Sequence, residues 1–480
     1  MTGITSLGAY IPTYRLNKEE IGRMWKAKGG AGEKAIAGYD EDAVTMAVTA
    51  AVDCAKKGKT ANGLYFATTS APYKEKQSAA IIAAAIDLDK TCRTAEFANS
   101  LRAGTSAMMA AMDTVASGSA EEVMVVASDC RIGAPKGRFE QLLGDGAAAF
   151  MIGSKDLIAT IEGTYSITSD FTDVWRMQED TFPQAAEARF VVEAGYVPTM
   201  KEAVSGLLTK YSLTPADFSK IVFPATDARE HADMAKALGF DKSHVQDPLF
   251  SQIGNTGAAA AMIMLVAAIE EANPGDRILF ANYGDGCDAF IFRVVKGVLG
   301  FTMKDRMAEK VSIDYGTYLA WRGLVPTEPP AFPPRADPSF AARWRERSSV
   351  TTLKGFKCRK CGTPQIHTIA QGVRICIACQ TKDEFDIYNF ADKPAKLFTY
   401  AVDILQPTKN PPGVNGVIDF DGGGRLVCEL TDCNIDKVKV GMPLEMTFRK
   451  MSQSKGTVNY FWKAKPILGA NSPYRPSKRS

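Results

Sequence analysis

The sequence predicts a layered α/β protein with a duplicated domain, followed by a small metal-binding module and a small β-barrel. Three observations support this prediction. One pattern occurs twice, near residues 100 and 255, four cysteines form two close pairs between residues 358 and 379, and five short strand patterns occupy residues 396–467. A chain of 480 residues is long enough for two or three domains.

The repeated pattern has three parts, which come in the same order in both copies. A helix rich in small residues is followed by an apolar run, and a Gly-Asp-Gly turn then leads into a second apolar run. These parts begin at Arg102, Val123 and Gly144 in the first copy and at Gly254, Ile278 and Gly284 in the second. Uninterrupted apolar runs are typical of strands buried on both faces. A duplicated α/β domain is therefore expected over residues 1–300.

Further elements of this domain follow from local patterns. The alternation in residues 4–11 predicts a strand, and Asp40 predicts the start of a helix with apolar residues spaced by three and four. Residues 64–67 and 221–223 are expected to be buried strands. Residues 199–213 and 231–238 are expected to be helices that cover the second half.

Six prolines lie between Leu324 and Pro338, so this segment is neither helix nor central strand and indicates a domain boundary. The predicted organisation is an N-terminal half at 1–160, a second half at 161–300, a linker at 301–350, a metal-binding module at 351–385, a barrel at 386–470 and a basic tail at 471–480.

The cysteine pairs are the most specific local signal. Cys358 and Cys361 form one Cys-x-x-Cys pair, and Cys376 and Cys379 form another fourteen residues later. Four thiolates at this spacing are typical of a zinc ribbon, and because all four ligands come from the protein the Zn²⁺ would be structural. A redox role is less favoured, since neither pair opens a helix of a βαβ unit.

The strand patterns of residues 396–467 predict a barrel of the OB type. Nucleic acid is not expected as a partner, because the aromatic residues lack a basic stripe and the net charge is only +3. No apolar stretch is long enough to span a membrane, and no secretory leader opens the sequence. We therefore expect a cytoplasmic protein with no membrane partner.

The first 300 residues resemble the thiolase superfamily, specifically the archaeal and bacterial 3-hydroxy-3-methylglutaryl-CoA synthase branch. The matching motifs are Gly-Ala-Tyr-Ile-Pro at the start, Ser70-Ala-Pro-Tyr, Glu96-Phe-Ala, Ala103-Gly-Thr, Ile253-Gly-Asn-Thr and Tyr283-Gly-Asp-Gly. The remainder resembles zinc-ribbon/OB proteins that accompany thiolase-like subunits. The resemblance implies a duplicated five-layered thiolase fold, a rubredoxin-like zinc ribbon and an OB-type barrel. It also implies an acyl-CoA substrate, with coenzyme A as part of that substrate, and a homodimer formed through the thiolase domain.

The catalytic residues of the family are not found at the matching positions. Superposing the motifs places the family's acyl-accepting cysteine at Leu101 or Asn99, its glutamate at Thr69 and its histidine at Pro224. An acyl-enzyme needs a nucleophile that ionises near neutral pH, which leucine and asparagine do not provide. The first hypothesis is therefore aldol or retro-aldol chemistry on a 3-hydroxyacyl-CoA through a stabilised enolate.

Two alternatives stay open. One is Claisen-type acyl transfer of the synthase or thiolase kind, with Cys287 or a thiol of another chain as nucleophile. The other is a non-catalytic protein that binds or channels acyl-CoA.

The candidate catalytic residues are Tyr283, Asn255, Tyr73, His231 and Asp227. The resemblance assigns Asn255 to polarising a carbonyl, and the tyrosines, Asp227 and His231 are candidates for proton transfer. Each of these four has a competing structural role: either tyrosine as packing at a strand end, Asp227 as a helix cap and His231 as a solvated helix residue.

The residues expected to contact the substrate or its CoA are Ser100, Arg102, Gly104 and Gly254. Arg102 is a candidate for contact with a CoA phosphate or a substrate carboxylate. The alternative role of Ser100 is that of a helix cap.

Overall fold

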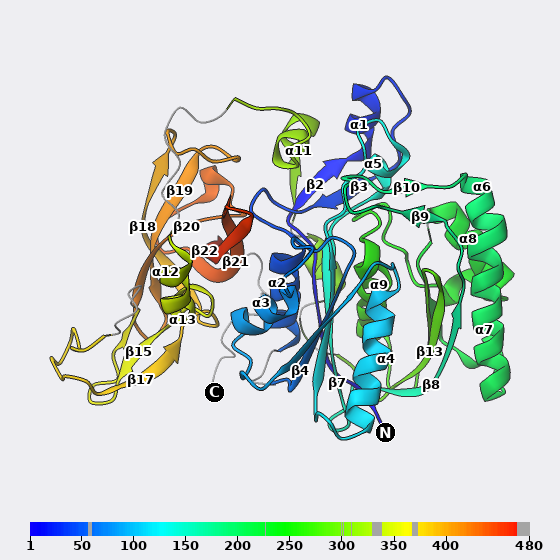
Figure 1. Cartoon of the computed structure of the whole chain (residues 1–480), viewed down its shortest axis with the longest axis horizontal. Helices are drawn as coiled ribbons and strands as arrows, with labels where there is room; N and C mark the ends of the chain where they lie inside the picture. Colours follow the sequence, from blue (N-terminus) through cyan, green and yellow to red (C-terminus); the bar gives the residue numbers. More distant parts are fainter. Residues whose placement is uncertain are drawn as a thin grey trace. The chain divides into compact units, whose positions relative to one another are not determined.

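The computed structural model describes residues 1–55, 60–225, 227–298, 300, 302–308, 310–328, 338–366 and 373–467 (Figure 1). Most of the predicted proline-rich segment, at 329–337, and the predicted basic tail at 471–480 lie outside these residues. The chain divides into two compact units. The first comprises residues 1–37, 42–83 and 88–324, and the second comprises 38–41, 84–87 and 325–480.

A mixed sheet, nine-stranded within the described residues, forms the centre of the first unit. Its strands, in spatial order, are β11 (Lys220–Val222), β12 (Arg277–Tyr283), β13 (Gly286–Val294), β8 (Ala159–Thr168), β1 (Gly3–Tyr10), β7 (Gly146–Gly153), β6 (Val123–Asp129), β4 (Gly63–Thr68) and β5 (Arg93–Ala98). The two halves meet where β1 and β8 pair over two residues.

The two halves of this sheet have the same topology, which confirms the predicted duplication. The first half runs β1-β7-β6-β4-β5 and the second runs β8-β13-β12-β11. Corresponding strands pair in the same direction. In the first half β7 is antiparallel to both β1 and β6, and β6 is parallel to β4. In the second half β13 is antiparallel to both β8 and β12, and β12 is parallel to β11. Val245 forms a parallel bridge to Ile221 and so occupies the place that β5 has in the first half.

Helices separate and cover the two halves in five layers (Figure 1). Helix α4 (Ala103–Ala116) and helix α9 (Ala260–Glu271) lie in the middle layer, with α4 against β4 and β6 and α9 against β7 and β12. Helix α2 (Ala43–Cys54) covers β1 and β7, and α7 (Val197–Tyr211) covers β8 and β13. Small residues permit the close central packing, since a Cβ on Gly104 would lie 3.1 Å from Met262 Cγ.

The remaining elements of the first unit surround this framework. A small sheet has the order β14 (Val311–Ile313), β2 (Tyr14–Asn17) and β3 (Glu33–Ile36), and a two-stranded ribbon pairs β9 (Val174–Trp175) with β10 (Gln184–Ala185). The other helices are α1 (Lys18–Met24), α3 (Ser78–Ala85), α5 (Arg138–Leu142), α6 (Ala188–Phe190), α8 (Ala228–Ala237), α10 (Met303–Ala308) and α11 (Tyr315–Trp321). No helix among the described residues is long and apolar enough to cross a bilayer.

The second unit contains two antiparallel sheets. The smaller sheet has the order β16 (Pro364–Gln365), β15 (Lys354–Cys358) and β17 (Phe385–Asn389), preceded by α12 (Phe340–Arg345) and α13 (Arg347–Val350). The larger has the order β20 (Arg425–Glu429), β19 (Gly413–Phe420), β18 (Ala395–Asp403), β21 (Pro443–Ser454) and β22 (Thr457–Pro466). A parallel bridge between Leu430 and Ala464 joins the two ends of this order. The larger sheet therefore closes on itself, which confirms the predicted OB-type barrel.

Candidate active site and metal site

Asp129, at the carboxyl end of β6, ties together the strand ends of the first half. Its Oδ1 accepts hydrogen bonds from Thr68 Oγ1 at 2.9 Å, Thr69 N at 2.7 Å and Ser70 Oγ at 2.8 Å. Its Oδ2 accepts from Thr69 Oγ1 at 2.8 Å and from Ala258 N at 2.7 Å. Asp129 has no exposed surface. Thr69, at the position where the resemblance implies a glutamate, is therefore a hydrogen-bond donor to a buried carboxylate.

The turn at residues 99–102, which precedes α4, contains the two positions, Asn99 and Leu101, at which the resemblance places the family's cysteine. Asn99 has a positive φ of 69°, and Ala103 N donates to Ser100 O at 3.1 Å. The end of β12 lies against this turn. A Cβ on Gly284 would be 2.8 Å from Arg102 N, and Asn282 Nδ2 lies 3.4 Å from Leu101 O. The two pseudo-equivalent halves therefore meet at the expected reaction centre, and neither Asn99 nor Leu101 supplies a thiol.

Arg102 is engaged by buried groups of the first unit. Its Nη1 donates to Ile167 O at 3.0 Å and to Asp288 Oδ1 at 3.1 Å. Asp288, whose side chain is 4% exposed, also accepts from Thr105 Oγ1 at 2.8 Å. The ion pair therefore anchors the start of α4 to β13. Ser100 Oγ accepts a long hydrogen bond of 3.4 Å from Arg102 N, but the N-cap of α4 is Arg102, so the alternative of a helix cap at Ser100 is wrong.

Tyr283 ends β12 and carries a hydroxyl that is hydrogen-bonded to Asp173. Its ring packs edge-on against Tyr196, with centroids 5.2 Å apart. Burial raises the pKa of Tyr283, and the adjacent Asp173 carboxylate raises it further. Burial also raises the pKa of Asp173. Sequence reasoning missed Asp173, because the path of the loop after β8 does not follow from local patterns.

Asn255 stands in the loop that leads to α9. Its Oδ1 accepts from Gly257 N at 2.9 Å, and its Nδ2 donates to Ala225 O at 3.5 Å. A side-chain amide has two N–H donors, so a second N–H is available to a substrate oxygen. The preceding Gly254 has a φ of +75°, and a Cβ there would lie 2.9 Å from Leu142 O. Gly254 therefore permits the close approach of two loops.

The remaining proton-transfer candidates lie in different environments. His231 is 4% exposed, stacks on Phe223 and has its Nε2 3.1 Å from Phe223 O, so the alternative of a solvated histidine is wrong. Burial lowers the pKa of His231 to about 4, which leaves the ring neutral at pH 7. Asp227 caps α8 by accepting from Arg229 N and Glu230 N. Tyr73 is half-buried, and Lys76 Nζ lies 5.9 Å from its ring centroid.

Two thiols lie near these strand ends, Cys287 fully buried and Cys130 partly exposed. Cys287 has no exposed surface, and its Sγ lies 3.6 Å from Met200 Sδ. Burial raises the pKa of Cys287. Cys130 follows Asp129 and has its Sγ 2.8 Å from Arg322 Nη1, and burial raises its pKa to about 12. Both thiols are protonated at neutral pH and are weak nucleophiles.

The four predicted metal ligands converge in the second unit. The sulfur atoms of Cys358, Cys361, Cys376 and Cys379 all lie within 4.8 Å of one another. The 358–379 sulfur pair is 3.6 Å apart and the 361–376 pair 3.5 Å. A tetrahedral zinc site with Zn–S bonds of about 2.3 Å has neighbouring sulfurs about 3.8 Å apart. The thiol geometry therefore fits a tetrahedral metal ion.

The two cysteine pairs have the same backbone geometry. Gly362 N donates to Cys358 O, as Gln380 N does to Cys376 O, and both residues at these positions have positive φ. The hydroxyls of Thr363 and Thr381 lie 3.1 and 3.3 Å from the second sulfur of each pair. This repeated knuckle directs both sulfurs of each pair to one point.

Two family models match separate parts of the chain, one in each unit. Residues 208–293 match the model of the 3-oxoacyl-[acyl-carrier-protein] synthase III C terminal, and residues 390–449 match that of the ChsH2 C-terminal OB-fold domain. Hydroxymethylglutaryl-CoA synthase of Pyrococcus furiosus is 36% identical over 331 residues, which are 66% of this chain and 94% of that protein. The enzyme of Methanopyrus kandleri is 33% identical over 335 residues, or 66% and 95%.

Solved structures resemble the first unit in fold. A hydroxymethylglutaryl-CoA synthase in complex with CoA aligns with a TM-score of 0.60 and 19% identity over 66% of this chain and 89% of its own. The 3-oxoacyl-[acyl-carrier-protein] synthase III of Aquifex aeolicus aligns with a TM-score of 0.53 and 20% identity, over 61% and 100%. These similarities confirm the predicted thiolase-type α/β fold.

Proposed function

The chain belongs to the hydroxymethylglutaryl-CoA synthase family of the thiolase superfamily, and we propose that it makes or breaks a carbon–carbon bond of a 3-hydroxyacyl-CoA by aldol or retro-aldol chemistry. In the cleavage direction, a base takes the proton of the β-hydroxyl and the bond between the α- and β-carbons breaks. Its electron pair becomes a thioester enolate, which is protonated at the α-carbon. The products are an acyl-CoA and an aldehyde or ketone.

The observation that carries this proposal is the turn before α4. The resemblance places the acyl-accepting cysteine at Asn99 or at Leu101, neither of which is a thiol, and Cys287, the candidate replacement, is a fully buried neutral thiol beside Met200. Ping-pong acyl transfer requires a thiolate at this place. An enolate route requires none, because the acyl group stays on CoA throughout.

Stabilisation of the enolate falls to donors at the ends of the strands and helices. The N-terminus of α4 presents the positive end of the helix dipole. The second N–H of Asn255 is the side-chain donor to the thioester oxygen. Gly104 and Gly254 allow these backbone segments to approach closely, and we assign Arg102 to positioning α4 through Asp288.

Tyr283 is the group that we propose to exchange a proton with the β-oxygen of the substrate. Its hydroxyl is hydrogen-bonded to Asp173 and stands at the strand end that packs against the 99–102 turn. Asp173 holds the phenol in place and accepts the proton that the phenol passes on. Tyr73 remains a second proton-transfer candidate, whereas the caps and packing around Asp227 and His231 favour structural roles.

Two other functions have specific support. The names of the relatives favour Claisen-type condensation or cleavage by acyl transfer. A protein that binds or channels acyl-CoA without turnover is favoured by the loss of the family's Glu, Cys and His, whose expected positions hold Thr69, Leu101 or Asn99, and Pro224.

Incubating the full chain with a panel of 3-hydroxyacyl-CoA compounds separates the three functions. Release of aldehyde or ketone supports the aldolase, an acyl group transferred to the protein or to a second acyl-CoA supports acyl transfer, and binding without products supports the third.

Three further properties belong to this proposal. The four cysteines hold one structural Zn²⁺, which would cross-link the two knuckles of the ribbon. The chain forms a homodimer through the first unit, for which β5 offers an edge that pairs only with β4 among the described residues. The protein acts in the cytoplasm, consistent with ten cysteines that form no disulfide.

A further inference from the structure

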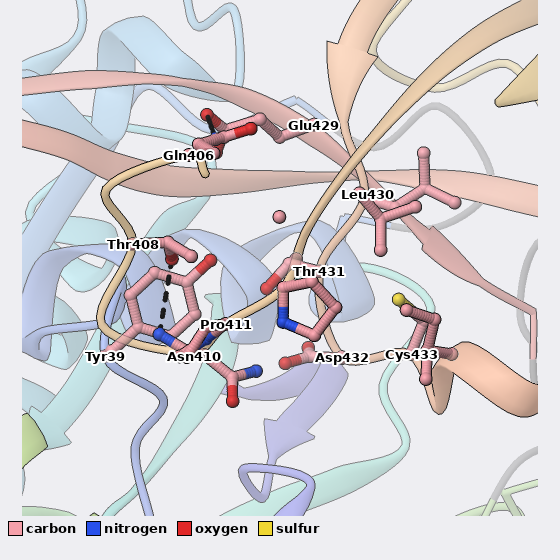
Figure 2. Close-up of a pocket in the computed structure, with 14 residues that line it drawn as sticks. Tyr39, Gln406, Thr408, Asn410, Pro411, Glu429, Leu430, Thr431, Asp432 and Cys433 are labelled. Carbon is pink, nitrogen blue, oxygen red and sulfur yellow. Dashed lines mark hydrogen bonds between the residues drawn. The ribbon is translucent and has the colours of Figure 1, made fainter. Parts of the chain in front are cut away.

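The second unit encloses a cavity that none of the activities above uses. It has a volume of about 180 Å³ and is lined by residues of the 406–414 loop, by residues 429–435 and by Tyr39 (Figure 2). All of these residues belong to the second unit. The second unit therefore contains a cavity large enough for a small ligand.

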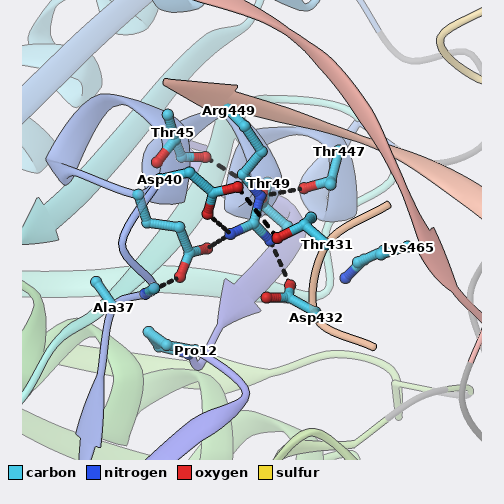
Figure 3. Close-up of polar contacts among 12 residues, drawn as sticks. Pro12, Ala37, Asp40, Thr45, Thr49, Thr431, Asp432, Thr447, Arg449 and Lys465 are labelled. Atoms are coloured by element: carbon cyan, nitrogen blue, oxygen red, sulfur yellow. Dashed lines mark hydrogen bonds and ion pairs between the residues drawn. The ribbon is translucent and has the colours of Figure 1, made fainter. Parts of the chain in front are cut away.

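Asp432, which lines the cavity, also belongs to a buried network of charges (Figure 3). Arg449, with no exposed side-chain surface, pairs with Asp40 at 3.4 Å, Glu41 at 2.6 Å and Asp432 at 2.5 Å. Lys463 pairs with Asp40 at 2.9 Å and with Glu429 at 2.8 Å. Four carboxylates thus share two cations. The adjacent Lys465–Glu445 pair is itself neutral, so the network has a surplus of two negative charges.

Asp432 is the network residue that places part of the excess negative charge at the cavity surface. It is 5% exposed, lines the cavity and uses Oδ2 for Arg449, whereas its Oδ1 has no hydrogen-bond partner among the described residues. A buried carboxylate oxygen without a donor is costly. The other acid in the wall, Glu429, is already satisfied by Lys463 and by Gln406 Nε2 at 2.9 Å.

The lining favours a particular kind of cation. The fourteen lining residues include no lysine, arginine or histidine; their polar side chains carry two carboxylates together with neutral amide, hydroxyl and thiol groups. The apolar groups are Pro411, Pro412, Val414, Leu430 and Ile435. The cavity holds roughly six water volumes, which is far more than a bare metal ion fills. Among the described residues, only the four ribbon cysteines form a group with metal-ligand geometry.

We propose that this cavity binds a small organic ammonium ion, with the ammonium group toward Asp432 and a short apolar body against Val414, Leu430 and Ile435. The N–H donors of the ligand supply the partner that Asp432 Oδ1 lacks. Its charge reduces the surplus of the network, and the amide and hydroxyl groups of Asn410 and Thr408 offer further acceptors. The site is independent of the proposed carbon–carbon chemistry in the first unit.

Thermal unfolding of the full chain tests this proposal with simple probes at constant ionic strength. n-Propylammonium chloride is expected to raise the unfolding midpoint of the second unit saturably, since a ligand that binds only the folded state stabilises it by mass action. Potassium, tetramethylammonium and n-propanol are the comparison probes, because they lack the N–H donors, the apolar body or the charge. An equal effect of any of these three, or no saturable effect of n-propylammonium, would overturn the proposal.

Variants locate the site. Asp432→Asn removes the charge at nearly constant volume and should weaken n-propylammonium binding roughly tenfold or more, measured by calorimetric titration. Cys433→Leu fills part of the cavity without replacing a charged residue and should weaken binding as well. Asp436→Asn, on the same loop but exposed and outside the lining, is the matched control and should bind like the unaltered chain. Unchanged binding in both cavity variants would contradict the assignment.

Discussion

Tyr283 is held by two neighbours of different kinds. The ring of Tyr196 packs edge-on against its ring, and the carboxylate of Asp173 accepts its hydroxyl. Both contacts keep the phenol protonated, because burial and the nearby carboxylate raise its pKa. A phenol that donates its one O–H to a carboxylate accepts a hydrogen bond from the β-hydroxyl of the substrate, so in the cleavage direction a proton passes from the substrate through the phenol to Asp173.

Removing the hydroxyl of Tyr283 should therefore impair catalysis more than stability. We expect Tyr283→Phe to lower kcat by roughly a hundredfold or more, the range typical of a general acid or base, with a small change in KM. Steady-state kinetics on the best 3-hydroxyacyl-CoA checks this. Tyr211→Phe, a matched change that removes a hydroxyl bonded to the Thr164 backbone on the outer layer, should leave kcat unchanged. Equal losses in both variants would contradict the catalytic role of Tyr283.

His231 makes the stability of the first unit depend on pH. Burial lowers its pKa from 6.5 to about 4, so the unfolded chain binds a proton at a higher pH than the folded chain does. His231 makes its whole contribution to the free energy of unfolding above about pH 6.5. This contribution, on the order of 3 kcal/mol, is lost as the pH falls toward 4. Urea unfolding of His231→Gln should show a weaker pH dependence between pH 4 and 6.5. An unchanged dependence would contradict the assignment.

At the scale of elements, the turn before α4 and the end of β12 are packed so closely that no side chain fits between them. A Cβ on Gly284 would lie 2.8 Å from Arg102 N and 3.1 Å from Ser100 Oγ. The sequence predicted both elements but not this contact, because they are almost two hundred residues apart. The partner of Arg102 could not be predicted from local sequence either. The charge of Arg102 suggested that it binds a phosphate, whereas in the structure it pairs with Asp288 of β13, which lies beside the start of α4.

Gly284→Ala should displace the 99–102 turn. We expect a cost of about 1–3 kcal/mol in stability from overpacking, together with a loss of activity larger than that of the control at the same temperature. Gly297→Ala is the control, since nothing lies within 4 Å of its added Cβ. Chemical unfolding and turnover measured on both variants check the prediction. Full activity in Gly284→Ala would show that the turn does not contribute to the reaction centre.

The convergence of the four cysteines is a feature that local spacing predicted well, because each knuckle is formed by residues adjacent in sequence. Cys376→Ser should reduce bound zinc from about one ion per chain to almost none and destabilise strands β15 to β17. Cys92→Ser, a half-buried cysteine outside the group, is the control. Metal analysis of the purified proteins gives the result. Retention of zinc in Cys376→Ser, or absence of zinc from the unaltered protein, would contradict a four-cysteine zinc site.

At the scale of the whole molecule, the duplication, the layered fold and the OB-type barrel were predictable, since each leaves a repeated or periodic trace in the sequence. The proposed reaction centre, which stays a prediction, combines residues from motifs with one that no motif marks. Asn255 and Tyr283 lie in recognisable motifs, whereas Asp173 comes from a loop with no regular pattern. Residues 38–41 were expected only as the start of a helix, yet they belong to the compact unit of the barrel, where Asp40 pairs with Arg449. Such long-range ion pairs leave no local signal.

The central claim is that carbon–carbon chemistry proceeds here without an acyl-enzyme. The most direct measurement is intact-mass spectrometry of the full chain, quenched with acid during turnover of a 3-hydroxyacyl-CoA. We predict the mass of the unmodified protein together with stoichiometric release of an aldehyde or ketone. A protein mass increased by the acyl group, mapped to any cysteine of the first unit, would contradict the account and indicate Claisen-type acyl transfer instead.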